Sequence, residues 1–355
     1  MNNTDREPII GCFKDLKLRR MEWLWPNRIP VGKLSLLVGV GGVGKSFLSL
    51  YMAAQVSTGR PWIDEPQLKS EGSRKPGDVF ILTTEDELDD TVGVRLTAAG
   101  ANLSRIHYIQ AVKTKDGIQG LNNLTTDVDI LIKAIRQVPT TKLIIIDPIS
   151  AYMEGKNENK NAEVREYLNP LIRLAAVGKL AIVGISHLNK NQDMSAANRV
   201  LGSTGFINAT RAAWLVHQDK NDSDRKLFVH MKGNLGVKPT GLAYKLMSQS
   251  VQTETGLEGS AYCAFEPDLL YITAEDLLGS DVKEQGRPKK QDDASDWLYE
   301  YLADGPKPAF QVIHDAGIAQ YGERTLRAAK KKLKIQSYKM VDEAGAPHWE
   351  WALAE

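Results

Sequence analysis

The stretch "LSLLVGVGGVGKSFLSLYMAA", residues 34–54, decides the fold of this chain. Its first residues are apolar and suit a buried strand, and its last residues suit a helix. The glycine-rich centre fits the pattern GxxxxGK[ST], with Gly39 and Gly44-Lys45-Ser46 at the defining places. A strand, a glycine-rich loop and a helix in this order are typical of the phosphate-binding loop of P-loop NTPases.

We therefore predict an ATP and Mg²⁺ site at this loop. Backbone N–H groups of the loop and of the helix N-terminus bind phosphates, and glycines let the backbone approach them closely. Lys45 is expected to reach the β- and γ-phosphates, and Ser46 is expected to bind Mg²⁺. The predicted nucleotide-binding residues are Gly39, Gly41, Gly42, Val43, Gly44, Lys45, Ser46 and Phe47.

The composition is that of an ordinary globular protein. The chain has 355 residues, is 42% hydrophobic and 25% charged, and has a net charge of +1, which argues neither for nor against nucleic acid. Cys12 and Cys263 lie outside any CxxC or Cys/His cluster, so we expect a reduced, cytoplasmic protein. The N-terminus lacks the apolar run of a signal peptide, and no apolar stretch approaches about 18 residues, so no membrane span is expected.

Apolar, β-branched runs alternate with amphipathic stretches on both sides of the loop. Such alternation predicts an α/β fold, and the nearly continuous apolar runs favour a mainly parallel twisted sheet that is buried on both faces. The expected strands are 33–39, 78–84, 142–148, 180–187 and 212–218, and the expected helices are 45–59, 88–100, 127–138 and 161–178. Two later strands, 226–234 and 242–252, are expected to be antiparallel.

The C-terminal part of the chain predicts a second, smaller domain. Polar residues 279–293 read as a linker after a core of residues 1–278, whose first 30 residues form an extension. Residues 294–355 then predict three helices, the first capped by Ser295, followed by a hairpin. This layout is typical of a winged-helix-like DNA-binding domain.

A carboxylate is expected beside the predicted nucleotide. Asp147 ends the apolar strand "LIIID", where a carboxylate can bind Mg²⁺ through water; the alternative is a turn cap before Pro148. In many P-loop enzymes a catalytic Glu directly follows this Asp, but here Pro148 follows Asp147. The general base that activates the attacking water must therefore come from another strand. Glu85, after the strand 78–84, is the candidate, and the alternative is an acidic helix start with Asp86 and Glu87.

His187 ends the strand "AIVGISH" and could contact the γ-phosphate and respond to its loss. The alternative is a structural histidine with an ordinary hydrogen-bond partner. The position at a strand end, where the parallel strands deliver their functional residues, favours the sensor.

These motifs together resemble a known family. The order of "TTEDE" (83–87), "LIIIDPIS" (143–150), "ISHLNK" (185–190), "GSTGFINATRAAWLV" (202–216) and "VHMKGN" (229–234) is similar to that of the RepA-like branch of the RecA/DnaB superfamily. The segment "MEWLWPNRIPVGKLSLLVG" (21–39) is also similar, and the resemblance covers about residues 12–275. This branch contains hexameric replicative helicases and AAA-family ATPases of plasmids, phages and mobile elements.

The resemblance implies a RecA-like core that hydrolyses ATP between the subunits of a homo-hexamer and unwinds DNA. Arg211 matches the family's arginine finger, which acts on the neighbour's nucleotide; the alternative is a surface salt bridge. Lys232 matches a second basic residue of the family, which also acts in trans. Asn234 stands where the family has a further basic residue, so the match is incomplete. The alternative for Lys232 is packing at a strand end. A DNA-binding ATP switch and a RecA-like recombination filament remain as alternative functions.

The resemblance also implies two loops that face single-stranded DNA in a central channel, residues 150–161 and 189–205. Their basic candidates for phosphate contacts are Lys156, Lys160, Lys190 and Arg199, and their one aromatic residue is Tyr152. The alternative is a pair of ordinary solvated loops.

A second basic run lies in the third predicted C-terminal helix. Between Arg324 and Lys339 there are seven basic residues and no acidic ones, while Leu326, Ala329 and Leu333 share one helix face. Such a helix can dock its apolar face on its own domain and turn its basic face to a groove of duplex DNA. The alternative is that the basic face is only solvated. The predicted contacts are Arg324, Arg327, Lys330 and Lys331.

Overall fold

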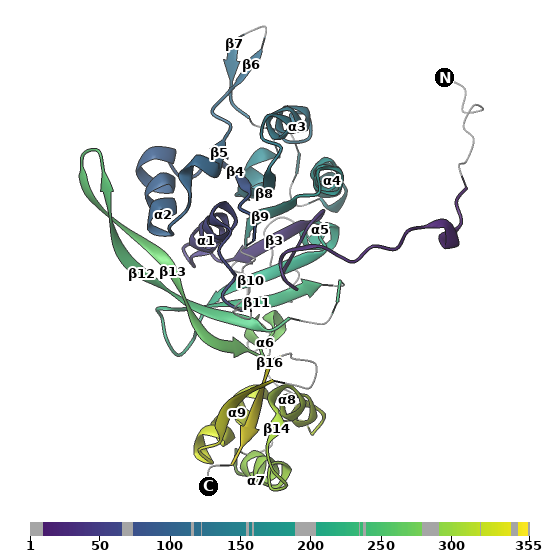
Figure 1. The fold of residues 1–355 in the computed structure, drawn as a ribbon, viewed down its shortest axis with the longest axis vertical. Helices are drawn as coiled ribbons and strands as arrows, with labels where there is room; N and C mark the ends of the chain where they lie inside the picture. Colours follow the sequence, from purple (N-terminus) through teal and green to yellow (C-terminus); the bar gives the residue numbers. More distant parts are fainter. Residues whose placement is uncertain are drawn as a thin grey trace.

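A large mixed sheet organises the protein (Figure 1). The computed structural model describes residues 10–65, 74–114, 117–121, 123–153, 156–157, 160–188, 204–233, 235–236, 239–278, 291–319, 321–341 and 347–353. Within these residues nine strands form one sheet in the order β13-β12-β11-β10-β3-β9-β8-β4-β5. Neighbours from β10 to β5 are parallel, and β11, β12 and β13 are added antiparallel.

The predicted mainly parallel α/β core is therefore confirmed. The bounds of the strands are β3 Leu34–Gly39, β4 Asp78–Thr83, β5 Ile106–Tyr108, β8 Thr141–Asp147, β9 Ala181–His187, β10 Ala212–Gln218, β11 Arg225–Gly233, β12 Gly241–Thr253 and β13 Gly256–Leu270. The helices of the core are α1 Lys45–Thr58, α2 Gly93–Ala98, α3 Val128–Gln137, α4 Asn161–Gly178, α5 Thr204–Ala209 and α6 Ala274–Leu278. Small hairpins are formed by β1 Trp23–Trp25 with β2 Ile29–Pro30, and by β6 Val112–Thr114 with β7 Gly117–Gln119.

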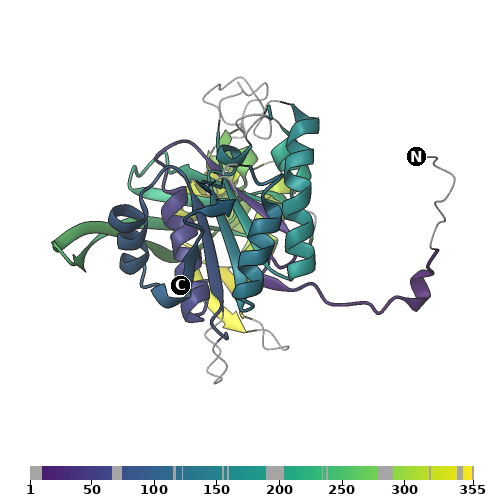
Figure 2. The same ribbon diagram turned by 90° about the horizontal axis from the view of Figure 1, so that it is seen from above.

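Helices cover both faces of the sheet (Figure 2). Successive side chains of a strand point to opposite faces, so Leu36 and Leu37 of β3 belong to two different hydrophobic clusters. The cluster of Leu36 includes side chains of α3, α4, α5 and α6, and that of Leu37 includes side chains of α1. Both strand faces are thus buried, which explains the continuous apolar runs in the sequence. No helix of the described part of the chain is long and apolar enough to cross a bilayer.

The hairpin of β12 and β13 was missed by the sequence analysis, which predicted only its first strand. The two strands pair antiparallel along most of their length and turn at Thr253–Gly256. Gly256 has a φ of 141°, so the turn needs a glycine. Its exposed outer half has no apolar run, and the hairpin projects from one side of the body (Figure 1).

The C-terminal unit has a core of its own. It contains α7 Gln291–Tyr301, α8 Ala309–Ile318, α9 Glu323–Lys332 and a small antiparallel sheet in the order β14 Lys307–Pro308, β16 Pro347–Ala352 and β15 Gln336–Val341. Side chains such as Leu298, Val312, Leu326 and Trp351 form its core cluster. Because α7 begins at Gln291, residues 291–293 are helical and do not belong to the predicted linker. Ser295 is buried inside α7, so its prediction as an N-cap was wrong.

Candidate active site

The glycine-rich loop joins the end of β3 to the start of α1. Gly42 and Gly44 have φ values of 74° and 95°, a left-handed region in which other residues are strained. A Cβ on Gly39 would lie 2.4 Å from the carbonyl oxygen of Val216, so this position excludes a side chain. A Cβ on Gly41 would meet nothing, which means that the loop faces open space where phosphates can enter.

Lys45 is folded against the loop. Its side chain is 4% exposed, and its Nζ donates to the carbonyl oxygens of Gly39 at 3.0 Å and Val40 at 2.9 Å. Burial lowers the pKa of Lys45, while the charges of Asp147 and Glu85 oppose this change. The ammonium group of Lys45 is thus held at the phosphate-binding loop, close enough to Asp147 and Glu85 to be influenced by their charges.

Strand register brings the predicted catalytic residues to one edge of the sheet. Gly39 of β3 pairs with His187 of β9, and Thr83 of β4 pairs with Asp147 of β8. The four neighbouring parallel strands therefore end together, and Glu85 follows β4 at the same edge. The structure brings these residues to Lys45 and Ser46, as the sequence predicted.

Asp147 and Ser46 form a pair that fits a divalent metal. The side chain of Ser46 hydrogen-bonds Asp147, which places a hydroxyl oxygen beside a carboxylate. Burial raises the pKa of Asp147 to about 6, although the hydrogen bond from Ser46 opposes the shift. A half-buried carboxylate whose charge is poorly compensated suits Mg²⁺, a cation that prefers oxygen ligands.

His187 lies between Lys45 and Glu85. Its Nδ1 is 3.4 Å from Lys45 Nζ, and its Nε2 is 3.8 Å from Glu85 Oε1. Burial and the charge of Lys45 lower the pKa of His187, and Glu85 opposes them. Glu85 is 57% exposed, so its carboxylate can meet water. Asp86, by contrast, pairs with Arg95 at 2.6 Å between Oδ2 and Nη1.

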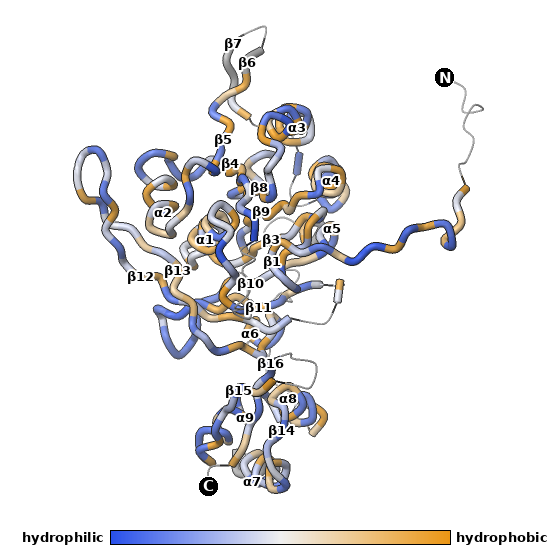
Figure 3. Tube along the Cα trace, in the orientation of Figure 1, coloured by the Kyte–Doolittle hydropathy of each residue, from blue (hydrophilic) through white to orange (hydrophobic). Residues whose placement is uncertain are grey.

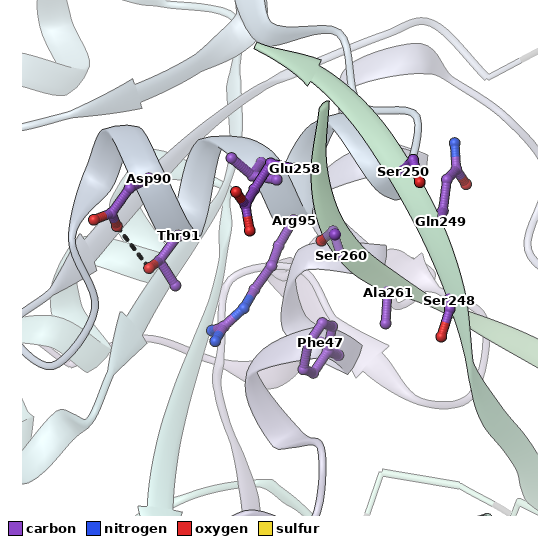
Figure 4. Close-up of a pocket in the computed structure, with 12 residues that line it drawn as sticks. Phe47, Asp90, Thr91, Arg95, Ser248, Gln249, Ser250, Glu258, Ser260 and Ala261 are labelled. Atoms are coloured by element: carbon purple, nitrogen blue, oxygen red, sulfur yellow. Dashed lines mark hydrogen bonds between the residues drawn. The ribbon is translucent and has the colours of Figure 1, made fainter. Parts of the chain in front are cut away.

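An open cavity of about 550 Å³ beside the loop was missed by the sequence analysis. It lies between α2, the start of α1 and the β12–β13 hairpin, and Figure 4 shows Arg95 and Phe47 among the residues that line it. The guanidinium carbon of Arg95 is 4.8 Å from the ring centroid of Phe47. Only Phe47 was named from sequence, because the wall of Ser248–Ser250 and Glu258–Ala261 comes from the unexpected hairpin.

Arg211 and Lys232 lie at the opposite, amino-terminal edge of the sheet. Ala212, directly after Arg211, pairs with Ser35 near the start of β3. Ser35 is four residues before Gly39, which is about 13 Å along the strand at a rise of about 3.3 Å per residue. Lys232 Nζ donates to the carbonyl oxygen of Ile207 at 2.7 Å, and burial lowers its pKa, assisted by the charge of Arg211. The structure therefore does not bring this basic pair to the loop of its own chain. Asn234 lies outside the described residues.

The basic candidates of the first predicted channel loop have partners on α4. Lys156 Nζ lies 3.0 Å from Glu166 Oε2, and Lys160 Nζ lies 3.0 Å from Glu163 Oε1. Tyr152 is 3% exposed and belongs to the core, so it cannot stack on a base as it stands. Lys190 and Arg199 of the second loop lie outside the described residues.

Helix α9 buries Leu326 and Ala329 and packs Leu333 against the C-terminal core, as predicted. Its basic face is less free than the sequence suggested. Arg327 Nη2 pairs with Glu323 Oε1 at 2.7 Å. Lys330 Nζ donates to Ser337 Oγ at 2.6 Å and lies 4.0 Å from the ring centroid of Trp351. The two remaining candidates, Arg324 and Lys331, are exposed.

The parallel sheet, the glycine-rich loop and the half-buried carboxylate of Asp147 together define a P-loop nucleotide-binding domain. A family model described as an AAA domain matches residues 9–193, more than half of the 355 residues. The chain therefore belongs to the AAA domain family. This membership supports an ATPase with a P-loop site, in which Mg²⁺ usually accompanies the nucleotide.

Proposed function

We propose that the chain is a DNA-stimulated ATPase that works as an oligomeric ring, a helicase of the RepA-like type in the replication of a plasmid, phage or mobile element. The carrying observation is the separation of two half-sites. Lys45, Asp147 and Glu85 meet at the carboxyl edge of the sheet, and Arg211 and Lys232 lie at the other edge. A head-to-tail assembly would place the second half-site of one copy against the first half-site of the next.

Each residue of the first half-site has a role in hydrolysis. Lys45 and the loop amides would hold the phosphates, and Ser46 with Asp147 would hold Mg²⁺, which neutralises charge on the transferred phosphoryl group. Glu85 would accept the proton of the attacking water, since its exposed carboxylate faces the site. His187 would transmit the loss of the γ-phosphate, because it contacts both Lys45 and Glu85.

The Phe47–Arg95 cavity would receive the base of the nucleotide. Its volume of about 550 Å³ is in the range of small-molecule sites. The guanidinium of Arg95 offers a planar, cationic surface, and the hairpin residues Ser248–Ser250 offer polar groups.

We further propose that residues 294–355 are a winged-helix-like DNA-binding domain. Three helices and a three-stranded antiparallel sheet with their own core support this proposal. Arg324 and Lys331, both exposed on α9, would contact phosphates, and Arg327 could do so after leaving Glu323.

Strand displacement on forked DNA tests the proposal. With ATP and Mg²⁺, we expect DNA to stimulate hydrolysis and the labelled strand to be released, whereas Lys45→Ala should show neither effect. The second candidate is a DNA-binding ATP switch, which is favoured by the separate core of the C-terminal unit. DNA-stimulated hydrolysis without any strand release would exclude the helicase and leave the switch.

A further inference from the structure

The segment of residues 10–21, which we call the arm, leaves the body of the protein (Figures 1 and 2). The backbone hydrogen bonds within it are local, from the amides of Asp15 and Leu16 to Cys12 and Phe13. Hydrophobic positions alternate with hydrophilic ones along it (Figure 3). Its large apolar side chains are exposed: Ile10 by 89%, Phe13 by 86%, Leu16 by 58%, Leu18 by 91% and Met21 by 37%.

This composition differs from that of a solvated tail. Segments that stay in water have few large apolar residues, because nothing offsets their exposure. An arm with five such side chains is instead expected to bury them against a surface. The described part of its own body does not cover them.

The root of the arm is firmly held. Trp25 of β1 is fully buried and stacks on Trp62, with 4.5 Å between ring centroids. Arg28 pairs with Asp64 at 2.8 Å, and its guanidinium lies 5.1 Å from the ring centroid of Trp214. The arm therefore departs from a fixed point, which favours an acceptor on another molecule over a return to its own body.

The arm and the basic pair share one flank of the molecule. Trp23, at the root, lines the same small hollow as Arg211 and Lys232. The β12–β13 hairpin projects on the opposite side of the body from the arm, and both views agree on this (Figures 1 and 2). A surface on one flank that binds a surface on the other makes a head-to-tail contact between identical copies.

The tip of the hairpin is complementary to the arm. Leu257 at the tip is 73% exposed, and Met247, which pairs with Tyr262 farther down the hairpin, is 46% exposed, so the hairpin offers apolar contacts. Glu254 and Glu258 are exposed near Leu257 at the tip and carry negative charge. The arm is basic between its apolar positions, with Lys14, Lys17, Arg19 and Arg20 against Asp15.

We propose that the arm of one copy binds the β12–β13 hairpin of the next copy of this chain. This contact draws the flank with Arg211 and Lys232 toward the neighbour's side that holds Phe47, the P-loop and Glu85. The inference rests on the proposed assembly and names the surfaces that hold it together. The arm is then a latch that brings Arg211 and Lys232 to the nucleotide site of the neighbouring copy.

Charges placed on the arm test the latch. The double variant Phe13→Glu, Leu18→Glu should raise the dissociation constant between copies about 10-fold or more, since buried apolar anchors dominate such contacts. Sedimentation at a series of concentrations with ATP measures this constant. Ile318→Glu, at an apolar residue of α8 that is 71% exposed, is the matched control and should leave it unchanged. An unchanged constant in the arm variant overturns the latch.

A crosslink tests the acceptor. Cys12 lies on the arm and is exposed, whereas Cys263 is buried, so a bifunctional maleimide can join Cys12 to Leu257→Cys of another copy. We expect covalent dimers and longer chains that disappear in the arm variant, and none with Ile318→Cys. Assembly without this crosslink overturns the hairpin as acceptor. A wild-type chain that stays monomeric with ATP and DNA instead overturns the proposed ring, which separates the two failures.

Discussion

The two edges of the parallel sheet differ in what their charged residues can do alone. At the carboxyl edge, Lys45, Asp147 and His187 approach one another, and burial shifts the pKa of each. At the amino edge, Arg211 is exposed and Lys232 is bound to carbonyl oxygens at the end of α5. One edge forms a site that can bind a nucleotide, and the other presents cations that have no nucleotide of their own. If the proposed ring forms, this difference makes hydrolysis depend on assembly.

The largest effect is expected at the carboxyl edge. Lys45→Ala removes the ammonium group from the phosphates and should lower ATP turnover about 1000-fold or more, because electrostatic stabilisation dominates phosphoryl transfer. Steady-state phosphate release measures this loss. Lys133→Ala, at an exposed position of α3, should retain normal turnover. Substantial hydrolysis by Lys45→Ala would remove the P-loop from the reaction.

The next effect tests whether the amino edge acts in trans. Arg211→Ala should lower turnover about 100- to 1000-fold and leave nucleotide affinity nearly unchanged, since a finger residue acts on the transition state. Each variant alone lacks one half-site, so an equal mixture of Arg211→Ala and Lys45→Ala should regain part of the activity at mixed interfaces. A mixture as inactive as its components would show that Arg211 does not serve the neighbour.

The third effect concerns stability and pH. Burial raises the pKa of Asp147 to about 6 from an ordinary value of 3.8, so this residue favours the ligand-free fold at low pH and the benefit is lost as pH rises through 6. Asp147→Asn should therefore stabilise the ligand-free protein at pH 8 by on the order of 2 kcal/mol, and less at pH 5. Urea unfolding at both pH values measures this. An equal gain at both would assign it to another cause.

The smallest effect is expected in the cavity beside the site. Arg95→Ala removes the planar cation over Phe47 and should weaken ATP binding by about 1 kcal/mol, or about fivefold. Fluorescence titration with ATP measures it, and Arg136→Ala on the far side of the sheet is the control. Pyrophosphate, which has no base, should bind both variants equally. A matching loss for pyrophosphate would place Arg95 at the phosphates.

Local patterns explain which parts of the site were predictable. Lys45, Ser46 and Asp147 occur in short motifs. Glu85 was predicted as the base because the residue after Asp147 is Pro148, which has no carboxylate. The Phe47–Arg95 cavity was not predictable, because one of its walls comes from a hairpin that lacks a clear apolar pattern. The partners of Lys330 were equally hidden, since Ser337 and Trp351 reach it only through the folding of the C-terminal sheet.

By itself, the sequence determined the loop, the parallel strands and the carboxylates at their ends, because hydrophobic periodicity and glycine conformations act over neighbouring residues. Only the tertiary structure decided that Arg211 and Lys232 lie at the edge remote from their own loop. That outcome depends on strand order and register, which bring together residues distant in the chain. The same reason holds for the arm: its apolar residues are visible in the sequence, and only the fold leaves them exposed.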